Sequence, residues 1–286
     1  QPWFFTQSSH RYNDLLTNYI RKYQVRGIPG YVNRISFDQT IVDYWSPVGG
    51  SDHLLLAHDG QNIFDRKTAT FTYTWKLAQN AIRVAEEEGK IAPLIIGVFH
   101  SSSSVDPDGR VKDLTPEDAF REGVKAAMPT QLNVEQLHGN KYLEKIFNVI
   151  APELIEETRS SVTPDATAMI GSSMGGLATL YSAIRFKERF HTALALSPHW
   201  PLGGDPLVDW MINKLPNQDH FRIWMSRGTK GLDASYKPFQ DRADALMRKL
   251  GWDESSFRSK VYHRTAHNER SWASYVNEPL RFWLSN

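Results

Sequence analysis

The most informative stretch of the sequence is Ala166-Thr-Ala-Met-Ile-Gly-Ser-Ser-Met-Gly-Gly-Leu-Ala-Thr-Leu-Tyr181. It begins with a strand-like apolar run, turns through a glycine-rich segment, and continues with apolar residues spaced for one helical face. Strand, tight turn and helix around Gly-x-Ser-x-Gly is the nucleophile-elbow pattern, whose central serine has a strained backbone. The pattern predicts Ser173 as a nucleophile. An ordinary glycine-rich turn between a strand and a helix is the alternative interpretation.

The rest of the chain alternates between strand and helix patterns. Near-continuous apolar runs at 54–58 and 93–99 are typical of strands buried on both faces of a parallel sheet. Further strands are predicted at 192–197, 221–225 and 258–262, with helical patterns between them. This alternation predicts an α/β protein with a mostly parallel central sheet flanked by helices on both faces. Ligand-binding groups are then expected at the carboxyl ends of the strands.

Composition restricts the class of protein. The 286 residues, 41% hydrophobic and 23% charged, fit a single globular domain over 1–286. A net charge of +1 gives no reason to expect nucleic acid or an anionic membrane as partner. No apolar run is long enough to span a bilayer, and no signal-peptide pattern is present. We therefore expect a soluble protein, cytoplasmic or exported after removal of a leader; nothing in the sequence predicts its oligomeric state.

Two segments are predicted to lie outside the central pattern. Residues 1–30 are expected to form an N-terminal accessory helix, because Leu15, Leu16, Tyr19, Ile20 and Tyr23 share one helical face. Residues 100–140 are polar and leave the carboxyl end of a predicted core strand. Such a long connection in a compact domain favours a lid or a cleft wall, with a surface insertion as the alternative.

A serine hydroxyl needs a base to take its proton and a carboxylate to orient that base. After an elbow serine, the acid is expected beyond a later strand and the histidine beyond the last strand. Asp233 and His267 meet these two conditions in the sequence. Asp233 also fits the N-cap of a helix predicted from 234, and Glu269, close to His267, is the fallback acid.

With these residues in this order, the chain resembles the esterase D-related putative esterase family. That family includes feruloyl and acetyl-xylan esterases, enterochelin esterases and mycolyltransferases. The resemblance is carried by five stretches, in the family's order, at 54–65, 170–177, 195–200, 228–233 and 266–272. It implies the α/β-hydrolase fold and a triad of Ser173, Asp233 and His267. It also implies an oxyanion hole made by the backbone N–H groups of Met174 and Gln61.

One motif departs from the family pattern. Many relatives carry an arginine followed by an acidic-Tyr-x-Pro stretch after the strand at 93–99. Here Arg110-Val-Lys-Asp-Leu-Thr-Pro116 keeps the arginine and the proline but has leucine in place of tyrosine. Because this stretch shapes the pocket in relatives, the resemblance does not carry over a particular substrate.

Other chemistries have weak support in the sequence. His53, His58 and Asp59 are candidate metal ligands by residue type, but no His-x-x-x-His helix exists, and we expect no metal. No Walker or Gly-x-Gly-x-x-Gly stretch is present, so no cofactor is expected either.

The sequence thus predicts a serine esterase that forms an acyl-enzyme with a small-molecule or carbohydrate-linked ester. An acyltransferase of mycolyltransferase type, passing the acyl group to a sugar hydroxyl, is the first alternative. A non-catalytic binding protein on the same fold is the second. Trp200 and His199, directly after the strand next to the elbow strand, are expected to line the substrate pocket, with a core role for Trp200 as the alternative.

Overall fold

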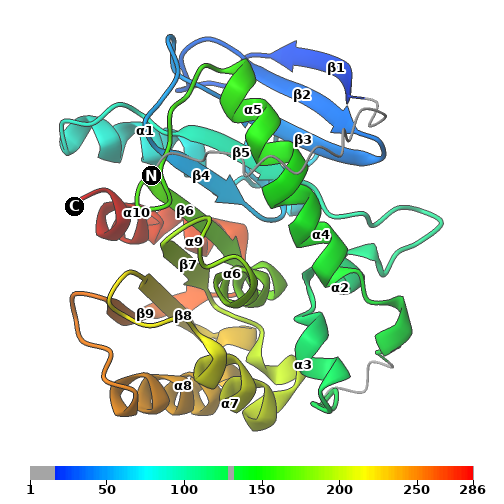
Figure 1. Ribbon diagram of the computed structural model, residues 1–286, viewed down its shortest axis with the longest axis vertical. Coiled ribbons are helices and arrows are strands. Elements are labelled where there is room, and N and C mark those ends of the chain that lie inside the picture. The colour runs from blue at the N-terminus through cyan, green and yellow to red at the C-terminus, as the bar shows by residue number, and fades with distance from the viewer. Residues whose placement is uncertain (1–16, 128–131, 286) are drawn as a thin grey trace.

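The central sheet follows the predicted α/β pattern. The computed structural model describes residues 17–127 and 132–285, which contain nine strands in the order β1-β2-β3-β5-β4-β6-β7-β8-β9 (Figure 1). The strands are β1 (Thr17–Tyr23), β2 (Val32–Phe37), β3 (Thr40–Trp45), β4 (Leu54–Ala57), β5 (Leu94–Val98), β6 (Thr167–Ser172), β7 (Thr192–Leu196), β8 (Arg222–Lys230) and β9 (Phe257–Ala266). Pairings from β5 through β9 are parallel, and those of β1–β2, β2–β3 and β3–β5 are antiparallel.

Helices cover both faces of this sheet, as predicted (Figure 1). They are α1 (Leu77–Glu87), α2 (Gly109–Leu114), α3 (Glu117–Arg121), α4 (Gly139–Lys145), α5 (Ala151–Glu157), α6 (Met174–Arg185), α7 (Gly204–Lys214), α8 (Lys237–Lys249), α9 (Glu269–Tyr275) and α10 (Asn277–Leu284). Within the part of the chain described, none of them is both long and apolar enough to cross a membrane. The α/β-hydrolase fold predicted from the sequence is therefore confirmed.

The alternation of side chains along the buried strands divides the core into two layers. In β4, Leu54 and Leu56 pack with α4–α8 on one face, whereas Leu55 and Ala57 pack with α1 and α10 on the other. All four side chains are at most 2% exposed. A strand buried on both faces needs apolar residues at every position, which explains the unbroken apolar run in the sequence.

The predicted N-terminal helix is wrong over the residues that the structure describes. Thr17–Tyr23 forms the edge strand β1, which pairs antiparallel with β2, while Leu15 and Leu16 lie outside the described residues. Tyr19 and Tyr23 fit a two-residue period as well as a helical one. The backbone hydrogen bonds to β2 and the hydrogen bond from Tyr23 Oη to Asp43 Oδ2, 2.7 Å, favour the strand.

The helical segment before the elbow strand is interrupted by a wider turn. α4 and α5 are joined by a π-helical turn over Ile146–Ile150, so the helical segment runs from Gly139 to Glu157. Pro152 lies near the start of α5. A proline lacks an N–H and clashes with the carbonyl one turn earlier, which accounts for the wider turn at this place.

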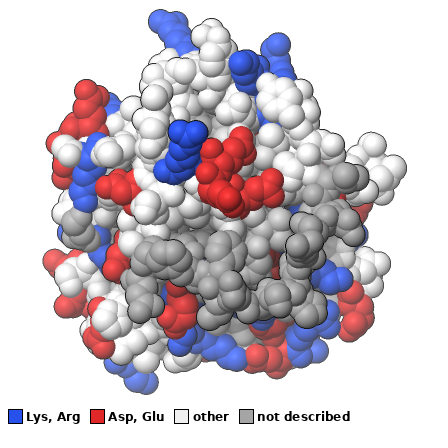
Figure 2. Space-filling model, turned by 45° about the horizontal axis from the view of Figure 1, so that its top comes forward, with Lys and Arg blue, Asp and Glu red and all other residues white. Residues whose placement is uncertain are grey.

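The surface charges agree with the small net charge of the sequence. On the face seen in Figure 2, basic and acidic side chains are interspersed among neutral ones. Among the described residues drawn there, acidic side chains gather in the upper centre, and the basic side chains form no extended stripe, so this part of the face offers no electrostatic footprint for a polyanion.

Candidate active site

The turn between β6 and α6 has the geometry of a nucleophile elbow. Ser173 has φ 57° and ψ −122°, a conformation that is unfavourable for a residue with a side chain. Its N–H donates to the Leu196 carbonyl at 2.9 Å, which fixes the turn to the end of β7. A Cβ on Gly171 would lie 2.2 Å from the Gly175 carbonyl oxygen, so only glycine fits where the chain crosses itself. The turn thus holds Ser173 at the carboxyl end of β6.

Asp233 and His267 come together at the same edge of the sheet. β8 and β9 run further than the sequence predicted, to Lys230 and Ala266, and each residue follows its strand within three positions. His267 Nδ1 lies 2.6 Å from Asp233 Oδ1. Among the hydrogen bonds of the described residues there is none from Ser173 Oγ to His267 Nε2; such catalytic contacts are often long before substrate binds.

The Asp233 carboxylate is buried and has hydrogen-bond donors for its oxygens. The residue is 1% exposed, and its Oδ2 accepts hydrogen bonds from Gly228 N at 2.7 Å and Ser197 Oγ at 2.9 Å. It lies within the 3₁₀ turn Gly231–Tyr236, and its side chain caps no helix. The N-cap interpretation of Asp233 is therefore wrong.

Glu269, the fallback acid, has a different partner. It opens α9, is 8% exposed, and its Oε1 accepts a hydrogen bond from Asn62 Nδ2 at 3.4 Å. Burial raises the pKa of Glu269, with the nearby Asp59 carboxylate adding to the effect. The Glu269 side chain thus supports the loop after β4, while Asp233 supports the imidazole.

The loop after β4 lies against the first turn of α6. Asp59 has left-handed backbone angles, φ 54° and ψ 48°, and Gly60–Asn62 then form a 3₁₀ turn. A Cβ on Gly60 would lie 2.3 Å from the Gly97 carbonyl carbon, so β5 requires glycine there. A Cβ placed on Gly175 would be 3.3 Å from Asp59 Oδ2, which shows how closely loop and helix approach. Gln61 and Met174, both in first helical turns, are brought to this junction, where backbone N–H groups lack intrahelical acceptors.

Arg110, which the sequence singled out only as part of a family motif, anchors this loop. Its guanidinium donates to Asp59 through two parallel bonds, Nε to Oδ1 at 2.8 Å and Nη2 to Oδ2 at 2.6 Å. Burial alone raises the pKa of Asp59, but the charge and hydrogen bonds of Arg110 outweigh it and hold the pKa below its usual value. Because Arg110 belongs to α2, the segment 100–140 borders the site; its role as a lid or cleft wall stays a prediction.

Aromatic residues enclose the histidine. The His267 ring meets Trp272 and Tyr236 edge-to-face, with centroids 5.0 Å and 5.3 Å away. His199, predicted to line the pocket, lies at this edge of the sheet. Its backbone N–H donates to the Ser173 backbone carbonyl at 3.0 Å. Its Nδ1 contacts the Tyr236 hydroxyl. No sequence motif predicts a role for Tyr236. Only its position three residues after Asp233 indicates that it lies near the site.

The burial of Trp200 argues against its predicted place in the substrate pocket. Its side chain is 0% exposed, and its indole Nε1 donates to Gln240 Oε1 at 3.1 Å. It packs with α7 and α8 in the core layer. Trp200 opens the 3₁₀ turn Trp200–Leu202, and its indole is held there by Gln240 of α8.

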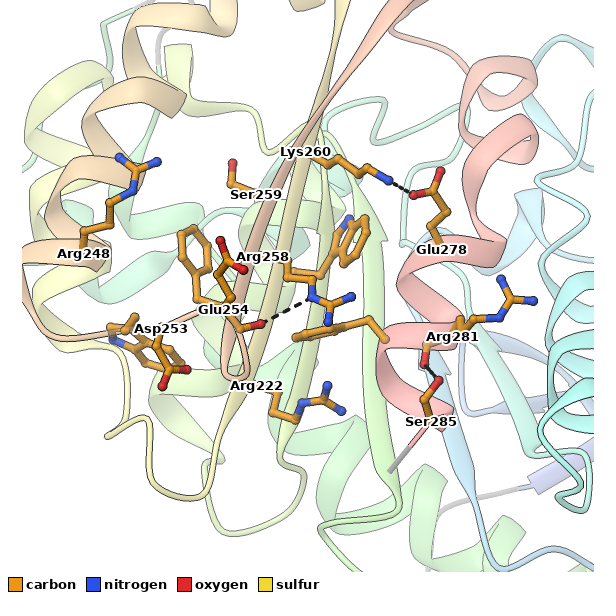
Figure 3. A pocket seen from close by; sticks show the side chains of 14 residues that line it. Arg222, Arg248, Asp253, Glu254, Arg258, Ser259, Lys260, Glu278, Arg281 and Ser285 are labelled. Carbon is orange, nitrogen blue, oxygen red and sulfur yellow. Dashed lines mark hydrogen bonds and ion pairs between the residues drawn. The ribbon is translucent and has the colours of Figure 1, made fainter.

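A sizeable cavity of the described structure lies at another edge of the sheet. It has a volume of about 1010 Å³ and is lined by residues at the starts of β8 and β9, such as Arg222 and Arg258, and by α10 (Figure 3). Parallel strands place their starts at the edge opposite to their ends. This cavity is therefore remote from Ser173 and His267 and cannot receive an ester for them.

Among the described residues, no group of three or more histidine, aspartate or glutamate side chains is arranged to hold a metal ion. The acid–base groups near Ser173 are instead paired with one another, as His267 with Asp233 and Asp59 with Arg110.

Comparison with solved structures supports the fold. The enterobactin hydrolase IroE in complex with DFP has a TM-score of 0.61 at 15% identity, with 95% of this chain and 96% of that chain covered. An IroE-like serine hydrolase from Shewanella oneidensis gives 0.60 at 17% identity, covering 92% and 79%. The enterobactin esterase FES from Shigella flexneri gives 0.60 at 14%, covering 94% of this chain but 60% of that longer one. No curated protein sequence matches the chain.

The family assignment rests on the sequence itself. Residues 40–283, from β3 to α10, match the family described as "Putative esterase". This range includes the elbow, Asp233, His267 and the loop after β4. The chain belongs to the putative esterase family and is an esterase.

Proposed function

We propose that the chain hydrolyses carboxylic esters through an acyl-enzyme formed on Ser173. The observation that carries the proposal is the 2.6 Å contact between His267 Nδ1 and Asp233 Oδ1 beside a strained elbow serine. Asp233 fixes the imidazole with its Nε2 free to act as base. His267 takes the proton of Ser173 as Oγ attacks the ester carbonyl, and then gives it to the departing alkoxide. Water repeats the sequence and releases the acid.

The negative charge on the carbonyl oxygen needs donors in place before the reaction. The backbone N–H groups of Met174 and Gln61 are our candidates, since both open helical turns at the junction of α6 and the loop after β4. Arg110 keeps that loop in its left-handed conformation by holding Asp59. In this proposal Arg110 acts on the oxyanion hole without touching the substrate.

The substrate is proposed as a small-molecule ester. Several similar structures are of enterobactin esterases. Sequence identities of 13–17% support a shared fold, but they do not identify the ester that this chain hydrolyses. Arg110 is bound to Asp59 by two hydrogen bonds and is therefore assigned no contact with the substrate. Acyl chains of graded length and hydroxycinnamoyl esters form the screen that identifies the preferred class.

The decisive experiment replaces the nucleophile. Ser173→Ala is expected to abolish hydrolysis of a short p-nitrophenyl ester and labelling by a fluorophosphonate probe. Ser172→Ala is the matched control, because Ser172 ends β6 with its side chain buried. Turnover that survives Ser173→Ala in the folded protein would disprove the assignment.

The acid is tested by a second pair of variants. Asp233→Asn removes the carboxylate bonded to His267 and is expected to lower kcat by about 10⁴-fold, as in other triads. Glu269→Gln keeps an oxygen that can accept from Asn62 and is expected to change kcat far less. The reverse order would move the triad acid to Glu269.

A further inference from the structure

Asn62 lies in the loop after β4, and the mechanism above gives it no task. It ends the 3₁₀ turn Gly60–Asn62 and is 5% exposed. A buried amide needs partners for its donors and acceptors, so those partners indicate what the residue holds together. Asn62 also directly follows Gln61, whose N–H is a proposed oxyanion donor.

The backbone of Asn62 closes the turn that contains Gln61. The Asn62 N–H donates to the Asp59 carbonyl at 2.9 Å, and the Asn62 carbonyl accepts from Trp75 N at 3.1 Å. Among the backbone hydrogen bonds that connect the described turns and loops, none is donated by the N–H of Gln61 or of Met174. Both groups belong to first helical turns, where an N–H has no intrahelical acceptor. The turn therefore leaves these two donors for another acceptor.

The side chain of Asn62 ties this turn to two other segments. Its Oδ1 accepts from Thr70 N at 2.8 Å, and its Nδ2 donates to Glu269 Oε1 at 3.4 Å. Glu269 opens α9, two residues after His267. One amide group thus connects the turn of Gln61 both to the chain that follows it and to the segment that carries the proposed base.

The segment 70–75 is one that needs such a connection. Phe71 and Thr72 have φ of 53° and 58°, left-handed values that are unfavourable for residues with bulky or branched side chains. Strained backbone of this kind persists only where surrounding contacts hold it. Both ends of the segment are bonded to Asn62, one through its side chain and one through its carbonyl. Loss of the Asn62 side chain would free one end and let the turn with Gln61 move.

We propose that Asn62 is a positioning residue for the oxyanion hole, which fixes the Gln61 N–H relative to the segment that carries His267. The inference rests on the proposed function of Ser173 and on Gln61 as a donor. A donor stabilises the developing oxyanion fully only if it is in place before the reaction, because a donor that must first move loses the benefit of preorganisation. Asn62 itself touches no substrate and acts through Gln61.

The test asks whether Asn62 acts on the charge at the carbonyl oxygen. Asn62→Ala is expected to lower kcat for a short p-nitrophenyl ester by about tenfold to a hundredfold, because loss of a whole oxyanion donor costs about 10²–10³-fold. KM is expected to stay nearly constant. The matching p-nitrophenyl thionoester places sulphur, a weak hydrogen-bond acceptor, in the oxyanion hole, so its kcat is expected to fall much less. The ratio of the ester rate to the thionoester rate should therefore decrease.

Two variants of Glu269 test the link from its other end. Glu269→Leu removes the acceptor of Asn62 Nδ2 and is expected to lower the same ratio, by about threefold, as for loss of one hydrogen bond. Glu269→Gln keeps an oxygen that can accept from Asn62 and is expected to restore the ratio. If the two residues act together, the double variant Asn62→Ala/Glu269→Leu is no slower than Asn62→Ala alone, and additive losses would overturn the proposal. Should Asn62→Ala fail to fold, the Glu269 variants decide, and equal ratios in the two of them overturn it.

Gln240→Ala is the control for a general loss of packing. Gln240 is also a buried amide, 2% exposed, and its side chain binds Trp200 and Asp244, but it lies in α8. This variant is expected to lower the stability of the protein and to leave the ratio of ester to thionoester rates unchanged.

The outcomes distinguish this inference from the proposed function. Fluorophosphonate labelling that persists in Ser173→Ala overturns both. Hydrolysis that requires Ser173 but shows an unchanged ratio in folded Asn62→Ala overturns the positioning role alone. Equal falls in the ester and thionoester rates have the same consequence, because the loss would then not concern the carbonyl oxygen.

Discussion

Removal of Arg110 is expected to cost more stability than removal of its partner Asp59. Asp59 is 1% exposed and cannot reach water, whereas the Arg110 side chain is 31% exposed and can. Arg110→Met therefore leaves a buried carboxylate without its guanidinium. Breaking a buried pair in this way costs about 3–5 kcal/mol, and we expect about 3 because Gln61 Nε2, 3.3 Å from Oδ1, remains as a donor. Asp59→Asn leaves a cation whose side chain is 31% exposed, beside an amide oxygen that can still accept a hydrogen bond from it, and is expected to cost about 1 kcal/mol.

The difference between Arg110→Met and the parent depends on pH. In the parent, Arg110 holds the pKa of Asp59 below its ordinary value, so the pair stabilises the fold at neutral pH and this is lost on acidification. In the variant, burial is offset only weakly, by the hydrogen bond from Gln61, and is expected to place the pKa of Asp59 above its ordinary value. The penalty for the buried charge then disappears as pH falls through that raised pKa. The loss of stability is thus largest near pH 7 and shrinks towards pH 4.

Urea unfolding followed by tryptophan fluorescence measures both effects, since the chain has nine tryptophans. Arg242→Met is the control: Arg242 also binds Asp209 through two bonds of 2.6 Å, but the pair is exposed to solvent, so its loss is expected to change the stability little. Arg110→Met should also lower kcat, by about tenfold or more, if the loop carries an oxyanion donor. Equal losses for Arg110→Met and Asp59→Asn, or a loss independent of pH, would refute the reasoning.

Three further predictions follow from local geometry. Trp200→Ala should destabilise the protein by about 3–5 kcal/mol in urea unfolding without changing the ratio of rates between short and bulky esters, because the indole is core. Gly171→Ala should prevent soluble expression, while Gly175→Ala, whose Cβ would lie 3.2 Å from His58 Cβ, should give folded protein with reduced stability. The free energy of unfolding should fall by up to about 1.4 kcal/mol per pH unit below pH 6.5 and flatten in His58→Gln, because burial lowers the pKa of His58 to about 4 and only the unfolded chain takes up the proton.

The sequence predicts the fold well where one physical constraint dominates. The run Leu54–Ala57 is apolar at every position because the strand is buried on both faces, and no helix competes with that reading at such a length. Ser173 is equally well specified, because the crossing of the chain at Gly171 tolerates no side chain. The segment with Tyr19 and Tyr23 failed because its apolar spacing fits a strand and a helix alike, and only the pairing with β2 decides between them.

The sequence predicts which residues lie near the site, but it does not predict which side chains from separate loops contact one another. Asp233 and His267 follow strand ends, so strand order alone places them at one edge. Trp200 also follows the end of a strand, but it belongs to a 3₁₀ turn and its indole is buried in the core. The spacing of apolar residues in the sequence does not reveal such a short turn.

Arg110 and Tyr236 are further from any pattern. Arg110 meets Asp59 from 51 residues away, and Tyr236 meets His199 from 37 residues away. Neither contact belongs to a helical or strand repeat or to a sequence motif with a fixed spacing. What selects them is burial: a carboxylate and a phenol that lose water must find a donor or acceptor among whatever the neighbouring loops present. A buried polar residue next to a predicted strand end is therefore a reason to look for a partner, although the sequence cannot say which loop provides it.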